Sequence, residues 1–279
     1  RRVLFRSGLR AEHVLLDDWL DMPDRVTGVV ISNEFFDALP VHLVTRRGED
    51  PGAWSEWCVA RDPEDRDALT LVEGPPSTRA FAAYFARLGL LPGDGARVEV
   101  GLASLDAMRR IAAKMERGYV LTIDYGYEAR DLYASWRREG TLMAFRHHSP
   151  VPDPLSEPGR TDLTYHVDLT SLAATALDSG EGWVAAPPTS QAEALTVLGL
   201  PDALRAAEAH AHEDALRFLA DRRAAETLRD PTGLGRIRVL ALARHGAIEG
   251  LACLRDVSER SEEHTSELQS RGLISYAVF

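Results

Sequence analysis

The chain has 279 residues, of which 45% are apolar and 27% charged, and its formal net charge at pH 7 is −11. This apolar fraction excludes a disordered chain, and two cysteines, Cys58 and Cys253, are too few for a disulfide scaffold. No apolar run approaches the roughly 18 residues that a membrane span needs, and an acidic chain with a single lysine, Lys114, is a poor partner for nucleic acid.

Both ends of the chain read as translated sequencing adapters. Residues 260–270 are RSEEHTSELQS and residues 274–279 are ISYAVF, which are two parts of one common library adapter, and residues 1–7, RRVLFRS, match the opposite primer. We therefore interpret residues 1–7 and 260–279 as adapter-derived and not native, the alternative being a real amphipathic tail. Because the chain has no initiator Met, we expect residues 8–259 to be a fragment of a longer protein.

The first half of the chain predicts strands. Two short β-branched runs, residues 26–32 (VTGVVIS) and 119–123 (YVLTI), are typical of strands buried on both faces. Between them, three loosely alternating segments separated by Gly, Pro and Asp predict an antiparallel meander at residues 41–47, 54–60 and 68–73.

Apolar residues at helical spacing predict a helix over residues 81–88, closed by Gly89, and a second over 105–115, ended by Gly118. Further predicted elements are a helix at 169–177, a strand at 183–186, a helix opened by the Ser190 and Glu193 capping box, an Ala-rich helix or helix pair to 228, and a strand at 236–243. Buried strands that alternate with helices predict an α/β fold. We interpret the meander and its helix as an insertion over residues 41–95 on the substrate side of the domain.

Polar residues follow the two buried strands at their carboxyl ends, where open α/β sheets bind ligands. Asn33 and Glu34, with Asp37 one turn on, follow the first strand, and Asp124 with Tyr125 follows the second. In the alternative interpretation, Asn33 caps a helix and the aspartates make ordinary turns. The apolar neighbours favour a site, because carboxylates in apolar surroundings are costly unless they hold something.

The segment over residues 146–162 is rich in Pro, His, Asp and Gly and predicts a long irregular loop, which in a compact domain is usually functional. We expect the residues in and just after it, Asp162, Thr164 and His166, to form a third polar group. His147 and His148 are adjacent and far from any Cys, so they predict no metal site. A metal-dependent hydrolase that uses them with Asp124 and Asp162 remains an alternative.

Four motifs together resemble one family. They are NEFFDALPVH (33–42), LTIDYGY (121–127), REGTL (138–142) and the DPL, PG and DLTYHVDL series (153–169). From about residue 12 to 243, the chain resembles the MidA-like class I S-adenosylmethionine-dependent methyltransferases. The resemblance implies a Rossmann-like α/β methyltransferase sheet with an inserted antiparallel meander. It also implies that the sheet is incomplete at its N-terminus and that the glycine-rich cofactor loop precedes residue 8, which would impair cofactor binding by residues 8–259.

The resemblance further implies a protein arginine N-methyltransferase that uses S-adenosylmethionine and acts on a respiratory-complex or other protein subunit. It implies a cytoplasmic location in a bacterium, and a mitochondrial one in eukaryotic relatives. The single Lys among many Arg residues separately indicates a GC-rich genome. A non-catalytic assembly factor or binding module on the same fold is the alternative.

Paired carboxylates suit a guanidinium substrate, which is planar and always charged. As catalytic residues we expect Glu34 and Asp124 to hold the guanidinium, Asn33 to orient the nucleophile or the cofactor, and Asp37 to support them. The cofactor would be contacted by Asn33, Glu34 and Phe35. The substrate would be contacted by Tyr125, Asp162, Thr164 and His166.

Overall fold

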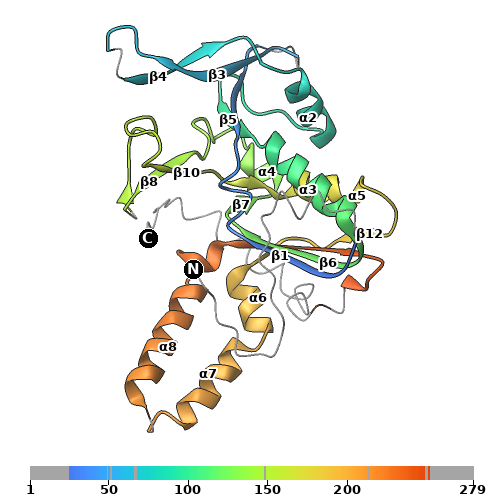
Figure 1. The fold of residues 1–279 in the computed structure, drawn as a ribbon, viewed down its shortest axis with the longest axis vertical. Helices are drawn as coiled ribbons and strands as arrows, with labels where there is room; N and C mark the ends of the chain where they lie inside the picture. The colour runs from blue at the N-terminus through green and yellow to red at the C-terminus, as the bar shows by residue number, and fades with distance from the viewer. Residues whose placement is uncertain are drawn as a thin grey trace.

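The computed structural model describes residues 25–48, 50, 52–65, 68–147, 149–212, 214–248 and 251. The two ends interpreted as adapter-derived, together with His148 and Cys253, lie outside the described residues. The described chain builds a central sheet, a smaller antiparallel sheet beyond one edge and a helical hairpin on the opposite side (Figure 1).

The central sheet has the strand order β1-β6-β14-β12, and a short strand, β13, also pairs with β14. These strands are β1 (Val26–Asn33), β6 (Met115–Asp124), β12 (Trp183–Ala185), β13 (Thr189–Ser190) and β14 (Arg238–Arg244). β1 and β6 are parallel, whereas β14 is antiparallel to β6 and β12. Asn33 pairs with Ile123, so the carboxyl ends of β1 and β6 meet at one edge of the sheet.

Two helices, α3 (Leu102–Lys114) and α5 (Leu169–Leu177), pack their apolar stripes on one face of this sheet. The main core residues are Phe36, Met108, Ile111, Met115, Val120, Leu169, Leu172, Trp183, Leu240 and Leu242. The bounds of α5 match the prediction. Gly118, predicted to end α3, lies inside β6 instead. Its φ is +131°, and a Cβ there would lie 1.9 Å from the carbonyl oxygen of Gly28, so the close approach of β1 explains the glycine.

The prediction that the first strand is buried on both faces was wrong for the described residues. β1 alternates between half-buried and exposed positions, and Val29 and Ile31 are 54% and 65% exposed. The reason is that β1 is the edge strand of the described sheet, and no described element covers the face that carries these two side chains.

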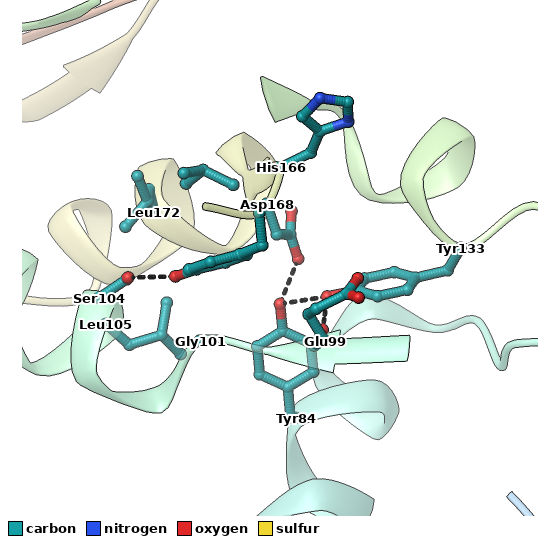
Figure 2. A pocket seen from close by; sticks show the side chains of 11 residues that line it. Tyr84, Glu99, Gly101, Ser104, Leu105, Tyr133, His166, Asp168 and Leu172 are labelled. Carbon is teal, nitrogen blue, oxygen red and sulfur yellow. Dashed lines mark hydrogen bonds between the residues drawn. The ribbon is translucent and has the colours of Figure 1, made fainter. Parts of the chain in front are cut away.

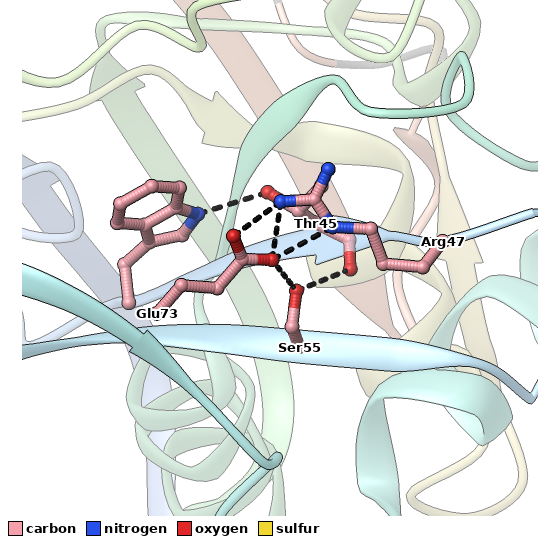
Figure 3. A network of polar contacts seen from close by, with 5 residues as sticks. Thr45, Arg47, Ser55 and Glu73 are labelled. Carbon is pink, nitrogen blue, oxygen red and sulfur yellow. Dashed lines mark hydrogen bonds and ion pairs between the residues drawn. The ribbon is translucent and has the colours of Figure 1, made fainter.

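The predicted meander is confirmed, and it gains a fourth strand beyond residue 95. The smaller sheet has the order β4-β3-β2-β5, all antiparallel: β2 (His42–Arg46), β3 (Trp54–Arg61), β4 (Leu69–Gly74) and β5 (Arg97–Val100). Helix α2 (Ala80–Leu88), ended by Gly89 at φ +63°, packs on it, with Phe85 stacked on Trp54 at 4.7 Å. Figure 3 shows the polar network on its surface, where Glu73 of β4 accepts from Arg47 and from Ser55 of β3.

The C-terminal helices follow the predicted order. The capping box of Ser190 and Glu193 opens α6 (Gln191–Val197), and the Ala-rich segment forms two helices, α7 (Leu200–Ala209) and α8 (Ala215–Arg229). The pair α7 and α8 projects away from the central sheet (Figure 1). A 3-10 turn over Leu234–Arg236 then leads into β14.

The segment predicted as an irregular loop is partly ordered into short strands. β8 (Met143–Arg146) pairs with β9 (Ser149–Pro150) and with β10 (Asp162–Thr164). β7 (Gly126–Tyr127), which precedes helix α4 (Ala129–Leu132), pairs in parallel with β11 (Val167–Asp168). These pairings bring residues 164–168 against the carboxyl end of β6.

Candidate active site

Asp124 stands at the carboxyl end of β6 and is fully buried. Its Oδ2 accepts hydrogen bonds from the backbone N–H groups of Phe35 (3.2 Å) and Phe36 (2.9 Å), and its Oδ1 accepts from that of Tyr125 (2.9 Å). The backbone N–H of Glu34, whose φ is +47°, donates to the carbonyl of Ile123 at 2.9 Å. The Asp124 carboxylate therefore holds the turn that follows β1.

Asp37 lies one turn further along and is only 6% exposed. Its Oδ2 accepts from the Thr164 hydroxyl at 2.7 Å. Its Oδ1 is buried and has no hydrogen-bond partner among the described residues. A buried carboxylate oxygen without a donor is costly, so Oδ1 of Asp37 is the unsatisfied acceptor of this site.

The carboxyl groups of Glu34, Asp37 and Asp124 all act electrostatically on Tyr125. Burial, and next the negative charge of Asp37, raises the pKa of Asp124 to about 7. Burial also raises the pKa of Tyr125, and the charges of Glu34, Asp37 and Asp124 raise it further. Glu34 and Asn33 are exposed, whereas the two aspartates are buried. A bound cation would relieve the repulsion among these carboxylates.

Residues 164–167 lie against the end of the sheet as a strap. The N–H of Tyr165 donates to the carbonyl of Asp37 at 3.3 Å, and the N–H of Val167 donates to that of Tyr125 at 2.8 Å. The Tyr165 hydroxyl pairs with Ser104 Oγ at 2.7 Å. The strap therefore fixes the Thr164 hydroxyl that contacts Asp37.

A second buried carboxylate, Glu99 of β5, supports the strap from the smaller sheet. It accepts from the N–H and hydroxyl of Thr141, each within 3.0 Å, and from the N–H of Leu142 at 3.0 Å. The Thr141 hydroxyl in turn accepts from the N–H of His166 at 2.9 Å. Gly140 has φ +73°, and a Cβ there would lie 2.2 Å from Glu99 Oε1, which explains the glycine of the REGTL motif.

A small cavity lies between the strap, α2 and α5 (Figure 2). Its volume is about 10 Å³, the space of one water molecule, so it is no substrate pocket. Asp168 is the N-cap residue of α5, and its carboxylate accepts here from the hydroxyl of Tyr84 (2.6 Å) and from the hydroxyl and N–H of Ser171. The Tyr84 hydroxyl also pairs with that of Tyr133 at 2.8 Å. This cluster joins the smaller sheet to the core.

The structure brings most of the predicted site residues together at the ends of β1 and β6: Asn33, Glu34, Phe35, Asp37, Asp124, Tyr125 and Thr164. His166 turns toward Tyr127 instead, with ring centroids 5.0 Å apart. Burial, and next the charges of Arg137 and Arg236, lowers the pKa of His166 to about 4. Asp162 is exposed at the start of β10, and its side chain makes no hydrogen bond within the described part of the chain.

Residue types and spacing did not single out Glu99, Tyr127 or Arg137. A charged residue between two apolar ones in the strand segment Val98-Glu99-Val100 was the available signal for Glu99. Tyr127 ends the motif LTIDYGY (121–127), but no role was expected for it, and for Arg137 the sequence carries no comparable signal, because its contacts are made only in the fold. In the described residues, no three His, Cys, Asp or Glu side chains gather as metal ligands.

Comparisons with known proteins show the family of this chain. Residues 7–186 match the model of a family described as putative S-adenosyl-L-methionine-dependent methyltransferases, and the chain belongs to this family. Its fold is accordingly a Rossmann-like methyltransferase α/β fold, and the described residues include the central sheet and the inserted meander.

Curated relatives are named protein arginine methyltransferase NDUFAF7, mitochondrial. The chain is 28% identical to the Rattus norvegicus protein over 275 residues, which is 95% of this chain and 59% of the relative. It is 31% identical to the Xenopus tropicalis protein over 184 residues, which is 64% of this chain and 39% of the relative. The chain thus spans about three fifths or less of these relatives.

A solved structure has a similar fold. It is a likely methyl transferase from Burkholderia thailandensis bound to S-adenosyl-homocysteine, with a TM-score of 0.73 and 30% sequence identity, covering 84% of this chain and 58% of that one. None of the described helices of this chain is both long and apolar enough to cross a membrane.

Proposed function

We propose that the protein containing this chain transfers a methyl group from S-adenosylmethionine to an arginine side chain of a protein. The observation that carries the proposal is the buried, unpartnered Oδ1 of Asp37 within a group of three carboxylates. A guanidinium supplies both the missing donors and the missing positive charge. The names of the relatives as protein arginine methyltransferases support the same reaction.

The residues present fit the expected cofactor in their chemistry. Asn33 and Glu34 are exposed where β1 ends, and their amide and carboxylate suit a cationic ligand. We propose that these two residues and Phe35 contact S-adenosylmethionine, which when bound supplies an electrophilic methyl group on a sulfonium. Side chains of this protein then bind and orient the substrate and accept its proton.

The hydrogen bonds divide the carboxylates into two roles. Asp124 is fully buried and its two oxygens are engaged by backbone N–H groups, so it holds the turn after β1. Glu34, which is exposed, and Asp37, which has a free oxygen, then bind the guanidinium. This assignment exchanges the roles expected for Asp37 and Asp124 from their spacing alone.

Asp37 also has a catalytic role in the proposal. Methylation would form a bond from the arginine nitrogen to the methyl carbon as the bond from that carbon to the sulfonium sulfur breaks, leaving S-adenosylhomocysteine, and the nitrogen would then have to lose one proton. Oδ1 of Asp37, which is buried and has no hydrogen-bond donor among the described residues, accepts it as the general base. Asn33 orients the nucleophile, and Tyr125, Thr164, His166 and Asp162 line the approach of the protein substrate.

For the biological setting, we propose a cytoplasmic bacterial enzyme whose substrate is a subunit of a respiratory or other protein complex. The Arg-rich, Lys-poor composition supports a GC-rich genome. The relatives named above are mitochondrial, which supports a related setting.

The test is methyl transfer by the full-length protein that carries these residues. Peptides with a single arginine are incubated with S-adenosylmethionine labelled in the methyl group, and matched peptides with lysine serve as controls. Calorimetry with S-adenosylhomocysteine on the same sample measures cofactor binding separately. We expect binding, and label on arginine only.

Two outcomes would overturn the proposal. Cofactor binding with label on another residue type would keep a methyltransferase but reject arginine as its substrate. No cofactor binding and no transfer would favour a non-catalytic binding module on the same fold.

A further inference from the structure

A cationic and aromatic cluster lies beside the site formed by Glu34, Asp37 and Asp124, which we call the carboxylate site. It consists of Tyr127, Trp136, Arg137, His166 and Arg236, and we refer to it as the Tyr127 cluster. The Arg137 guanidinium lies 4.9 Å from the Tyr127 ring centroid and 4.7 Å from that of Trp136. Arg236 donates to the Tyr127 hydroxyl at 2.9 Å, and the His166 ring lies against the same tyrosine.

The cluster has donors and positive charge but no anion. Within the described part of the chain, neither Arg137 nor Arg236 pairs with a carboxylate. Arg137 Nε and His166 Nδ1 are both buried without a hydrogen-bond partner among those residues. Two guanidinium groups close to one tyrosine repel each other, so the cluster is left with an unsatisfied N–H donor at Arg137 Nε and with two positive charges that no carboxylate of the described residues pairs.

We propose that the Tyr127 cluster binds the carboxylate of an Asp or Glu side chain in the protein substrate, close in sequence to the target arginine. Guanidinium N–H groups match a carboxylate in fork geometry, and the rings of Tyr127 and Trp136 keep the Arg137 side chain in place. Trp136 is 63% exposed, so it also offers a surface to the substrate backbone. The inference rests on the proposed function and names the class of substrate.

The spacing of the two sites supports one peptide that reaches both. Tyr125 lies in the carboxylate site, and Tyr127, two residues further on, lies in the cluster. On the strap, Thr164 likewise contacts the carboxylate site, and His166, two residues further on, contacts the cluster. The parallel pair of β7 and β11 holds these two segments side by side. Residues two apart in extended chain are about 7 Å apart, so the acid is expected within three residues of the arginine.

The charge of the whole chain argues for a single carboxylate over a polyanion. A net charge of −11 repels nucleic acid and anionic lipid at long range. A local cation pair in an acidic protein instead selects a substrate segment that carries one acid beside its arginine.

The experiment compares peptide pairs in the full-length protein that carries these residues. Each peptide has one arginine and one Glu within three positions of it, and its partner has Gln in place of Glu. For the unaltered protein we expect the Gln peptide to raise KM about tenfold, the effect of losing one charged hydrogen-bond pair, at similar kcat. R137Q and R236Q are expected to raise KM for the Glu peptide and to abolish the difference between the two peptides.

The exposed Arg223 on α8 supplies the matched control, and R223Q should keep the full preference for the Glu peptide. R137E should methylate a peptide that has Lys in place of Glu better than the unaltered protein does. This charge reversal tests the role of charge separately from that of packing. Equal KM for Glu and Gln peptides at every position overturns the inference while leaving arginine methylation intact. Absence of transfer to every arginine peptide instead rejects the proposed function on which the inference rests.

Discussion

Two pairs of buried carboxylates lie within this domain and differ in how they are satisfied. Glu99 and Asp168 join the smaller sheet to the core, and each of their oxygens accepts at least one hydrogen bond. Asp37 and Asp124 lie at the ends of β1 and β6, and there Oδ1 of Asp37 accepts none in the described part of the molecule. Burial raises the pKa of Glu99, Asp168 and Asp124 alike. The difference teaches that burial of an acid by itself marks no site, whereas an acid with an unsatisfied oxygen does.

The largest expected effect comes from D37N. It removes the proposed guanidinium ligand and proton acceptor, so turnover should fall about 1,000-fold, or about 4 kcal/mol in transition-state energy. Its stability at pH 8 should be unchanged or higher, because the repulsion with Asp124 disappears. Single-turnover rates and urea unfolding measure the two effects, with the exposed, surface-paired D221N as control. Normal turnover by D37N would show that the unsatisfied oxygen of Asp37 has no role in catalysis, and that the two carboxylate pairs do not differ in function.

Gly140 tests the satisfied pair. G140A places a methyl group against the Glu99 carboxylate at a positive φ, and we expect a loss of about 3 kcal/mol in the free energy of unfolding. Gly159 has φ +82°, and no atom lies within 4 Å of the place that an added methyl group would take, so G159A isolates the backbone strain alone. If G140A lost no more stability than G159A, the close fit around Glu99 would be incorrect.

Y84F removes one hydroxyl from the buried cluster and leaves Asp168 with its Ser171 donors. Unfolding should become easier by about 1 to 2 kcal/mol, the usual cost of a lost buried hydrogen bond. The kcat of the soluble variant should not change, since Tyr84 supports structure and touches no substrate. A large drop in kcat with normal stability would instead show that this cluster takes part in catalysis.

The smallest net effect is expected for the dependence of stability on pH, because two buried groups, Asp124 and His166, act in opposite senses. The pKa of Asp124 is about 7 in the folded chain and near 4 when unfolded, so its proton stabilises the fold, and stability is lost as pH rises from about 4 to about 7. His166 acts in the opposite sense, because its folded pKa of about 4 costs stability as pH falls below about 6.5.

Unfolding curves of the unaltered chain and D124N from pH 4 to 8 separate the two contributions. As pH rises, the unfolding free energy of the unaltered chain should fall relative to that of D124N. A constant difference would show that Asp124 titrates normally.

Much of the secondary structure was predictable because its causes are local. The α5 bounds, the Ser190 capping box and the three meander strands depend on residues within a few positions of one another. The placement of Asn33, Glu34, Asp37, Asp124 and Tyr125 at strand ends was likewise predictable from two β-branched runs. The exposed face of β1 was not, because its cover depends on neighbours that periodicity does not reveal.

By itself, the sequence determined the α/β class, the order of its elements and the family that its motifs resemble. Only the tertiary structure decided which carboxylates are satisfied, because each partner is distant along the chain: Thr164 is 127 residues from Asp37, and Thr141 is 42 from Glu99. The same holds for Gly118, whose need for a bare Cα arises from the backbone of Gly28 on another strand. Helix and strand patterns are set by near neighbours, whereas the free oxygen of Asp37 and the unpaired charges of the Tyr127 cluster exist only once distant segments have packed.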